Sequence, residues 1–283
     1  YMQAKNTLVN FCILLALAGM TLLAYWPSFQ VPFVFDDQHV IEKNEAIKDV
    51  GNFLTWDALT RQRPLTDLTL ALNYAWNGLD TFGYHVVNFC IHLLAVWVSY
   101  FLALSIFLTL PDWKGRIRAV VTAQGMAALA ALIFALHPVQ TQAVTYIAQR
   151  YTSMAGLFYM SAVLLYILGR WQLRRRCLAQ SLEMTSKGAK ACGFFLLLFG
   201  LSFLSGLAAF ASKQNALSLP LAILMAEYML FDRTWAGWKK KLVYLLPALV
   251  AFGLWALYSS GVLQGDMSLG SLLEETDRRT RET

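Results

Sequence analysis

Charged residues are scarce in this chain of 283 amino acids. Asp, Glu, Lys and Arg make up 14% of it, whereas hydrophobic residues make up 58%. Soluble domains carry about 25% charged residues. The mean hydropathy is +0.49, and the apolar residues gather in runs of roughly 18–23, a length that crosses about 30 Å of hydrocarbon. The composition excludes a soluble enzyme and predicts an all-α polytopic membrane protein.

The motifs of several enzyme classes are missing too. The chain has no glycine-rich phosphate loop, no GxSxG and no HExxH, so nucleotide hydrolysis and serine or zinc protease chemistry have no support. It has four cysteines, none placed to form a disulfide outside the membrane, and no CxxC pair suggests zinc. No internal repeat is evident.

We expect about seven transmembrane helices and a long first outer loop over 27–82. The first helix follows Lys5, is too long for the core of a signal peptide, and is expected to stay as an anchor. The predicted spans are 7–26, 86–108, 119–137, 152–169, 191–212, 214–231 and 242–259.

The distribution of charge predicts the orientation. With the N-terminus in the cytoplasm, the inner segments 111–118, 170–190 and 233–241 hold most of the Lys and Arg, and the outer segments hold most of the acids. Short basic inner loops fix topology by the positive-inside rule. The net charge of +6 therefore reflects topology and contact with inner-leaflet lipids. Nucleic acid is not an expected partner.

The outer loop is the least membrane-like part of the chain. Residues 31–35 are expected to be extended. Apolar residues at near-helical spacing predict amphipathic interfacial helices over 41–54 and 65–76, and a further one over 139–150. Long ordered loops are usually functional, so we expect 27–82 to be the catalytic loop.

Two adjacent acids, Asp36 and Asp37, follow an aromatic run that would hold them at the membrane surface. Partial desolvation there raises a carboxylate pKa and suits a general base. We therefore interpret them as the catalytic residues. The plain alternative is a solvated turn. A second alternative adds His39 and makes the three residues ligands of a divalent metal ion.

Cationic side chains lie on the same predicted side of the membrane. We expect Arg63, Arg150 and Lys213 to bind a phosphate, because a guanidinium binds phosphate oxygens through two donors. Lys213 is the most telling, since it lies in a four-residue hairpin between two spans. The alternative is that such residues only anchor the chain at the interface. Further candidates for the substrate site are Arg61, His85, Asn88, His137 and Gln142.

Three other polar residues have simpler explanations. His92, inside the second span, predicts a hydrogen bond between helices. His137, before Pro138, is expected to shape the end of the third span. Glu227, in the sixth span, is expected to pair at the interface with nearby Arg233.

An outer base, outer cations and an apolar cavity suit one reaction class. A polyprenyl-phosphate sugar would keep its phosphate at the interface and its lipid between helices. Asp36 or Asp37 would take the proton of an acceptor hydroxyl, and the cations would stabilise the leaving phosphate. A single displacement would invert the anomeric carbon. The mechanism requires no metal, although it would tolerate a divalent cation.

Five stretches carry a resemblance to a known family: FVFDDQHVIEKNEAI (33–47), RPLTDLTLALNY (63–74), GYHVVNFCIHLL (83–94), HPVQTQAVTYIAQR (137–150) and SKQNALSLPLAIL (212–224). In this combination and order the chain resembles the GT-C superfamily of membrane glycosyltransferases. More narrowly, it is similar to the transmembrane and tetratricopeptide-repeat O-mannosyltransferase family and its bacterial relatives.

This resemblance implies that Asp36 and Asp37 are the catalytic pair, that the donor is a polyprenyl-phosphate monosaccharide, and that an acceptor protein or glycan is the partner. It implies a bacterial inner membrane with the active site on the periplasmic face. It also implies a GT-C-like domain over 1–259 and a polar outer tail over 260–283 that leads to further helices and tetratricopeptide repeats. Gln142 and Gln214 depart from the family pattern, in which Glu is frequent at both positions.

Two other functions remain open at this stage. A transporter or flippase for a lipid-linked sugar or anion would use the same cations and no base. The long outer loop argues against it, because transporters keep their sites near mid-membrane. A non-catalytic subunit that anchors a partner is the third interpretation.

Overall fold

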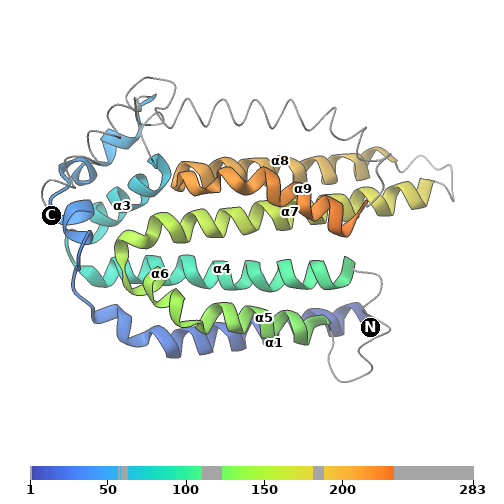
Figure 1. Cartoon of the computed structure of the whole chain (residues 1–283), viewed down its shortest axis with the longest axis horizontal. Helices are drawn as coiled ribbons and strands as arrows, with labels where there is room; N and C mark the ends of the chain where they lie inside the picture. The colour runs from blue at the N-terminus through green and yellow to red at the C-terminus, as the bar shows by residue number, and fades with distance from the viewer. Residues whose placement is uncertain (1, 57, 59–62, 110–122, 181–187, 233–283) are drawn as a thin grey trace, which may run out of the picture.

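The computed structural model describes residues 2–56, 58, 63–109, 123–180 and 188–232. Within these ranges the fold is all-α, and no strand occurs. The longer helices lie side by side along one direction, and α3 and the short helical turns lie together at one end of them (Figure 1). The helices are α1 (Met2–Tyr25), α3 (Pro64–Asn77), α4 (Thr81–Thr109), α5 (Ala123–Leu136), α6 (Thr141–Thr145), α7 (Arg150–Gln180), α8 (Gly188–Ser212) and α9 (Leu219–Leu230).

Four helical segments of the described chain are long and apolar enough to cross a membrane: Thr7–Gln30, Thr81–Thr109, Ile147–Arg174 and Phe194–Ser212. A fifth candidate is α5 joined to Pro138–Thr145 across a bend of 51°. The predicted sixth span is a short turn, η7 (Gln214–Ser218), followed by α9 with 12 residues. The predicted seventh span and the tail lie outside the described residues, so the count of seven stays a prediction.

Small residues bring α5 close to its neighbours. Ala127, Ala131 and Ala135 recur every four residues and therefore share one face of α5. All three are fully buried in a cluster with Leu17 of α1 and Val96 of α4. Small residues at such positions let helix backbones approach closely in a membrane bundle. The predicted helix–helix hydrogen bond of His92 is also confirmed, because its Nε2 lies 3.1 Å from the Ala135 carbonyl oxygen.

The segment 38–53 corrects the prediction of one amphipathic interfacial helix over 41–54. It forms three separate turns, η2 (Gln38–Glu42), η3 (Glu45–Lys48) and η4 (Val50–Phe53). The side chains of Asn44 and Asp49 accept hydrogen bonds from backbone N–H groups two residues further along the chain. Each of these bonds caps the start of a new turn, η3 after Asn44 and η4 after Asp49. Such local bonds compete with a continuous helix. Ile41, Ile47 and Phe53 are buried in a common core rather than facing the interface.

The second predicted amphipathic helix is confirmed as a helix, α3, and the chain turns after it at Gly78, whose φ is +58°. The buried face is not the predicted apolar stripe. Leu72 and Trp76 of that stripe are exposed. Polar Thr66 and Asn73 are buried instead, because they face Ser212 and Arg150.

The predicted interfacial helix over 139–150 is likewise three short pieces, η5 (Pro138–Gln140), α6 and η6 (Ile147–Gln149). Pro138 starts the first of them, after His137 Nδ1 accepts the N–H of Val139 at 3.3 Å. His137 therefore shapes the end of α5 as predicted. The breaks place 138–149 across the same end of the bundle as the loop 26–53 (Figure 1).

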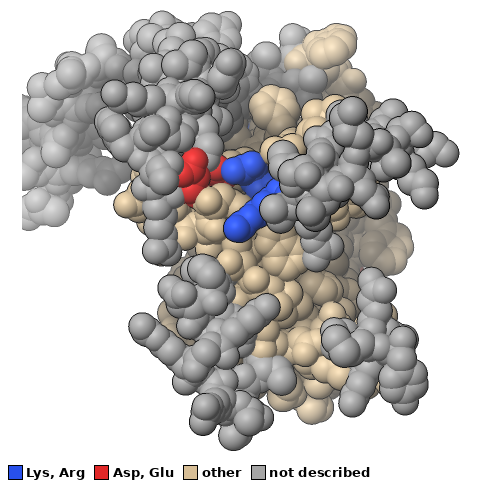
Figure 2. All heavy atoms as spheres, turned by 90° about the vertical axis from the view of Figure 1, so that its right-hand side faces the viewer, with Lys and Arg blue, Asp and Glu red and all other residues tan. Residues whose placement is uncertain are grey.

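At the opposite end, Glu227 of α9 forms an ion pair with a neighbouring helix. Its buried carboxylate binds Arg170 of α7 through two bonds of 2.7 Å and accepts the Tyr166 hydroxyl at 2.8 Å. Arg233, the expected partner, lies outside the described residues. Figure 2 shows acidic and basic side chains in contact at this end of the bundle. A charge on one helix is thus neutralised by a neighbouring helix, which lowers the cost of burying it.

Candidate functional site

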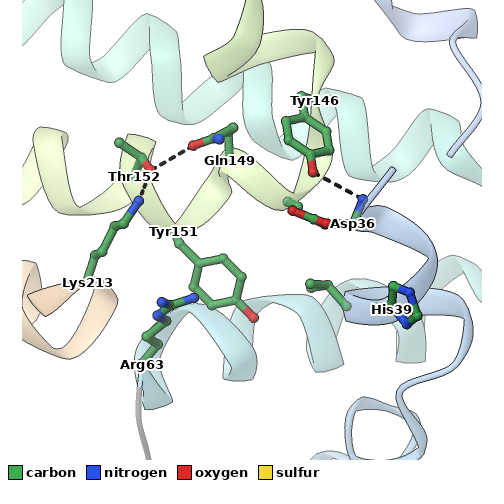
Figure 3. A pocket seen from close by; sticks show the side chains of 10 residues that line it. Asp36, His39, Arg63, Tyr146, Gln149, Tyr151, Thr152 and Lys213 are labelled. Carbon is green, nitrogen blue, oxygen red and sulfur yellow. Dashed lines mark hydrogen bonds between the residues drawn. The ribbon is translucent and has the colours of Figure 1, made fainter. Parts of the chain in front are cut away.

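A polar cleft of about 260 Å³ opens where the loop after α1, the start of α3, the turns before α7 and the α8–α9 hairpin meet. Its sides come from segments that are distant in the sequence, as Figure 3 shows. The lining residues are Asp36, His39, Val40, Arg63, Tyr146, Ala148, Gln149, Tyr151, Thr152 and Lys213. The structure therefore brings one predicted catalytic acid together with two of the predicted phosphate ligands.

The two adjacent acids have different environments. Asp37 is fully buried. Its Oδ1 accepts the N–H of Ala148 at 2.7 Å and its Oδ2 accepts the N–H of Val34 at 3.1 Å. Burial raises the pKa of the Asp37 carboxyl, and the bonds from backbone N–H groups oppose this effect. Asp37 holds the loop against the turn before α7 and does not line the cleft.

Asp36 is exposed and lines the cleft. Its backbone N–H donates to the hydroxyl of Tyr146 at 3.1 Å. The backbone is strained at the residue before Asp36, because Phe35 has a φ of +50°. Left-handed backbone costs an L-residue about 1–2 kcal/mol. Asp36 is thus the member of the acidic pair whose carboxylate is accessible to a substrate.

Lys213 enters the cleft from the α8–α9 hairpin. Its Nζ donates to Thr152 Oγ1 at 2.7 Å, and Thr152 donates to Gln149 Oε1 at 2.8 Å. Partial burial lowers the pKa of Lys213, and the charge of Arg63 lowers it further. An anion between the two cations would relieve that repulsion.

Arg63 precedes α3 and has a φ of +60°. A residue before proline is disfavoured in helical conformations, so this backbone is strained. It directs the guanidinium over the ring of Tyr151, 5.1 Å from the ring centre. The Tyr151 hydroxyl donates to Asp67 at 2.5 Å. Arg63 is therefore held in the cleft by stacking on an aromatic ring that is itself fixed by a hydrogen bond.

Arg150 departs from the prediction that it binds phosphate. It is completely buried and does not line the cleft. Its Nε donates to Asn88 Oδ1 at 2.7 Å. The two terminal nitrogens donate to the Thr69 carbonyl, Asn73 Oδ1 and the Tyr84 carbonyl. Arg150 therefore joins α3, α4 and α7 from inside, with its donors occupied by neutral acceptors.

Four of the remaining candidates, His85, Asn88, His137 and Gln142, do not line the cleft. His85 is buried, with Nε2 2.8 Å from the Val31 carbonyl oxygen, and Asn88 holds Arg150 as described. His137 and Gln142 are exposed and do not line the cleft. Arg61 lies outside the described residues. His39 does line the cleft, yet no group of three His, Cys, Asp or Glu in the described chain could hold a metal ion. The carboxylate of Asp37 is buried and bonded to backbone N–H groups, and it does not line the cleft with Asp36 and His39.

Four polar side chains of the cleft were not singled out from the sequence: Tyr146, Gln149, Tyr151 and Thr152. Their signal is the spacing of polar side chains three apart at 146, 149 and 152, which places them on one side of a helical turn. The interpretation of 139–150 as one interfacial helix conceals this signal.

An apolar cavity adjoins the polar cleft along α7. A cavity of about 180 Å³ shares Thr152 and Lys213 with the cleft. A further cavity of about 270 Å³ shares Thr152, Gly156 and Tyr159 with the 180 Å³ cavity. This larger cavity is lined mostly by apolar groups. The second cavity extends between α4, α5 and α7 to Phe134 and Met160. A charged end and a long apolar end of one ligand could therefore bind on the same helix.

Comparison with known proteins finds several relatives that are named protein O-mannosyl-transferases. The chain is 30% identical over 218 residues to Protein O-mannosyl-transferase TMTC1 of Homo sapiens, which covers 72% of this chain and 22% of the relative. It is 30% identical over 182 residues to Protein O-mannosyl-transferase Tmtc3 of Drosophila melanogaster, covering 57% of this chain and 19% of the relative. It is 27% identical over 223 residues to Protein O-mannosyl-transferase F38B6.6 of Caenorhabditis elegans, covering 74% of this chain and 27% of the relative.

No family model matches the chain, and no solved structure matches it. The chain spans less than a third of the length of each of these three relatives. The resemblance inferred from the five sequence stretches is confirmed by them. In sequence, this integral membrane protein is a relative of the protein O-mannosyl-transferases.

Proposed function

We propose that the protein is an inverting, GT-C-type glycosyltransferase that moves a monosaccharide from a polyprenyl-phosphate donor to a Ser or Thr hydroxyl of an acceptor protein. One observation carries the proposal: accessible Asp36 shares a single cleft with Arg63 and Lys213. The names of the relatives add that a protein is the acceptor and mannose is the first sugar to test.

In this mechanism Asp36 is the general base. The acceptor hydroxyl gives its proton to the Asp36 carboxylate while its oxygen attacks the anomeric carbon of the sugar. The bond from that carbon to the phosphate oxygen breaks, and polyprenyl phosphate leaves with the electron pair. Attack from the face opposite the phosphate inverts the anomeric carbon. A positioned base of this kind contributes about 10²–10⁴-fold to a rate.

Arg63 and Lys213 would stabilise the leaving phosphate. The mutual repulsion of the two cations, which lowers the pKa of Lys213, falls when a phosphate anion lies between them. That relief is greatest as negative charge develops on the departing phosphate, so it favours the transition state over the bound donor. The reaction needs no metal in this scheme. A divalent cation bound with the phosphate would also stabilise the negative charge of the leaving group.

The apolar cavity next to Lys213 supports a lipid-linked donor over a soluble nucleotide sugar. It begins at Thr152, which the Lys213 ammonium contacts, and continues along α7 between apolar side chains. The first part of a polyprenyl chain would lie there and the rest in the surrounding bilayer. The positive-inside pattern supports an N-terminus in the cytoplasm and a cleft on the outer face, which in a bacterium is the periplasmic face of the inner membrane.

Transfer of label from a radiolabelled polyprenyl-phosphate mannose to a Thr-containing peptide tests the proposal, with the full-length protein in membranes. We expect transfer by the wild type and a loss of 10²-fold or more in Asp36→Asn. Arg63→Met and Lys213→Met should raise the KM for the donor. Donor binding without transfer by wild type and Asp36→Asn alike would overturn the enzyme and favour a transporter. Unchanged transfer by Asp36→Asn would overturn the base.

A further inference from the structure

Backbone strain in the described chain is concentrated at the cleft. Among the described residues, two other than glycine have positive φ, Phe35 and Arg63. Arg63 lines the cleft, and Phe35 directly precedes Asp36, which also lines it. Residues held in such conformations cluster at functional sites, where the surrounding structure must enforce them. For Arg63 the reason is visible, because the strained backbone directs a cation into the cleft. Phe35 needs its own explanation.

The turn itself does not explain a phenylalanine. The N–H of Asp37 donates to the Val34 carbonyl at 3.0 Å and closes a four-residue turn with Phe35 in second place. A positive φ at that position favours glycine. Burial does not explain it either, because the Phe35 side chain is 84% exposed. A large apolar side chain is therefore kept in a position that costs stability and leaves it exposed.

The Phe35 ring has one aromatic neighbour in the described structure, Tyr146, edge to face with 6.4 Å between ring centres. Tyr146 lines the cleft and its hydroxyl accepts the N–H of Asp36. The two rings thus flank the proposed base. Figure 3 shows Tyr146 and Asp36 on one side of the cleft and Lys213 with Thr152 on the other, with Tyr151 between. The apolar cavity opens on the Lys213 side.

We propose that Phe35, together with Tyr146, contacts the acceptor polypeptide and determines which residues beside the acceptor hydroxyl are preferred. This inference rests on the proposed function. The donor occupies the Lys213 side, so the acceptor reaches Asp36 from the side that the two rings flank. Aromatic faces bind apolar side chains and proline rings that lie next to the reacting Ser or Thr.

The test is transfer of labelled mannose to a library of blocked peptides, each with one Thr and a varied residue on either side. The variants are Phe35→Gly, which relieves the turn, Phe35→Tyr, which keeps a ring, and the control Trp76→Ala. Trp76 is also a large exposed aromatic residue, 73% exposed, and it does not line the cleft. Each variant is assayed for the KM of donor and of peptide separately, and for thermal stability.

We expect Phe35→Gly to be at least as stable as the wild type. It should raise the KM for apolar-flanked peptides about tenfold or more, abolish the preference for them, and leave the donor KM unchanged. Phe35→Tyr should restore the preference, and Trp76→Ala should match the wild type. Unchanged peptide preference in Phe35→Gly would overturn the inference, as would a fall in kcat alone, which would make Phe35 a residue that positions Asp36. Absence of transfer by the wild type to every peptide is a different outcome, since it overturns the proposed function and this inference with it.

Discussion

The buried Asp37 carboxylate accepts the backbone N–H of Ala148, 111 residues further along the chain, at a distance of 2.7 Å. This bond fixes the loop after α1 to the turn before α7. It leaves the neighbouring Asp36 directed to the cleft that both segments line. One acid of the pair therefore holds the site together, and the other is available for chemistry.

Substitution should separate these two roles. Asp37→Ala leaves the N–H groups of Ala148 and Val34 without their acceptor, at a cost of about 1–3 kcal/mol for each group. We expect a marked fall in thermal stability in detergent and loss of activity in proportion to the fraction folded. Asp36→Ala should lose activity at wild-type stability. Equal thermal stability of Asp37→Ala and wild type would contradict the anchoring role.

The Asp37 carboxyl also predicts a pH dependence of stability. Its pKa is raised in the folded state by burial, so the folded protein holds the proton more tightly than the unfolded chain. Stability should then fall as pH rises from the unfolded pKa of about 4 through the folded pKa. Asp37→Asn does not titrate and should lose this contribution. The measurement is the melting temperature of the wild type and of Asp37→Asn between pH 3 and 7. The difference between the two melting temperatures at each pH gives the contribution of Asp37.

The lowered pKa of Lys213 predicts an alkaline limit on donor binding. The ammonium should lose its proton at a lower pH than an ordinary lysine, whose pKa is about 10.4. The donor KM should therefore rise with pH earlier than for an unperturbed lysine. Lys213→Arg keeps its charge throughout this range and should move the rise to higher pH. A donor KM with the same pH profile in both proteins would contradict a contact between Lys213 and the phosphate.

Arg150 should act on stability rather than on the donor. Arg150→Ala removes the guanidinium that donates to Asn88, Asn73 and two backbone carbonyls inside the protein. We expect a loss of about 3 kcal/mol or more in stability. Arg150→Lys should recover only part of it, because an ammonium cannot reach four acceptors on two helices as a planar guanidinium does. A folded Arg150→Lys protein with a normal donor KM would support this assignment, whereas a raised donor KM at wild-type stability would restore the phosphate role.

The bond between Arg170 and Glu227 links α7 and α9 at the end of the bundle opposite the cleft. Removal of one partner of a buried pair leaves an unpaired charge and costs about 3–5 kcal/mol. Arg170→Met and Glu227→Gln should each lower the melting temperature, and the double variant should be less destabilised than the sum of the two. Activity per folded molecule should not change. Additive losses would show that the two side chains do not interact.

Much of this fold follows from composition. Long apolar runs predicted α1, α4, α7 and α8, since only helices satisfy the backbone inside a membrane. The segments between the apolar runs were harder to predict. Ile41, Ile47 and Phe53 have helical spacing, but Asn44 and Asp49 interrupt the helix through their own side chains. Spacing alone does not distinguish a continuous helix from turns that bury the same residues.

For the candidate site, the sequence indicated Asp36, Arg63 and Lys213, because charged residues next to apolar spans are rare enough to stand out. It could not distinguish Asp36 from Asp37, or Arg63 from Arg150. In each pair the difference is which side chain finds partners in the interior, and those partners, Ala148 and Asn88, come from distant parts of the chain. Tertiary contacts of this kind leave no periodic pattern in the sequence.

One helix, α7, carries both the polar cleft and the apolar cavity. Thr152 borders both, and Met160 lies in the cavity eight residues further along. A helix rises 1.5 Å per residue, so these positions are separated by about 12 Å along a nearly rigid axis. A ligand that extends from Thr152 to Met160 must therefore span this fixed distance. Movements of the loops at the cleft would change access for the phosphate of the proposed donor, but they would leave unchanged the depth to which its lipid extends.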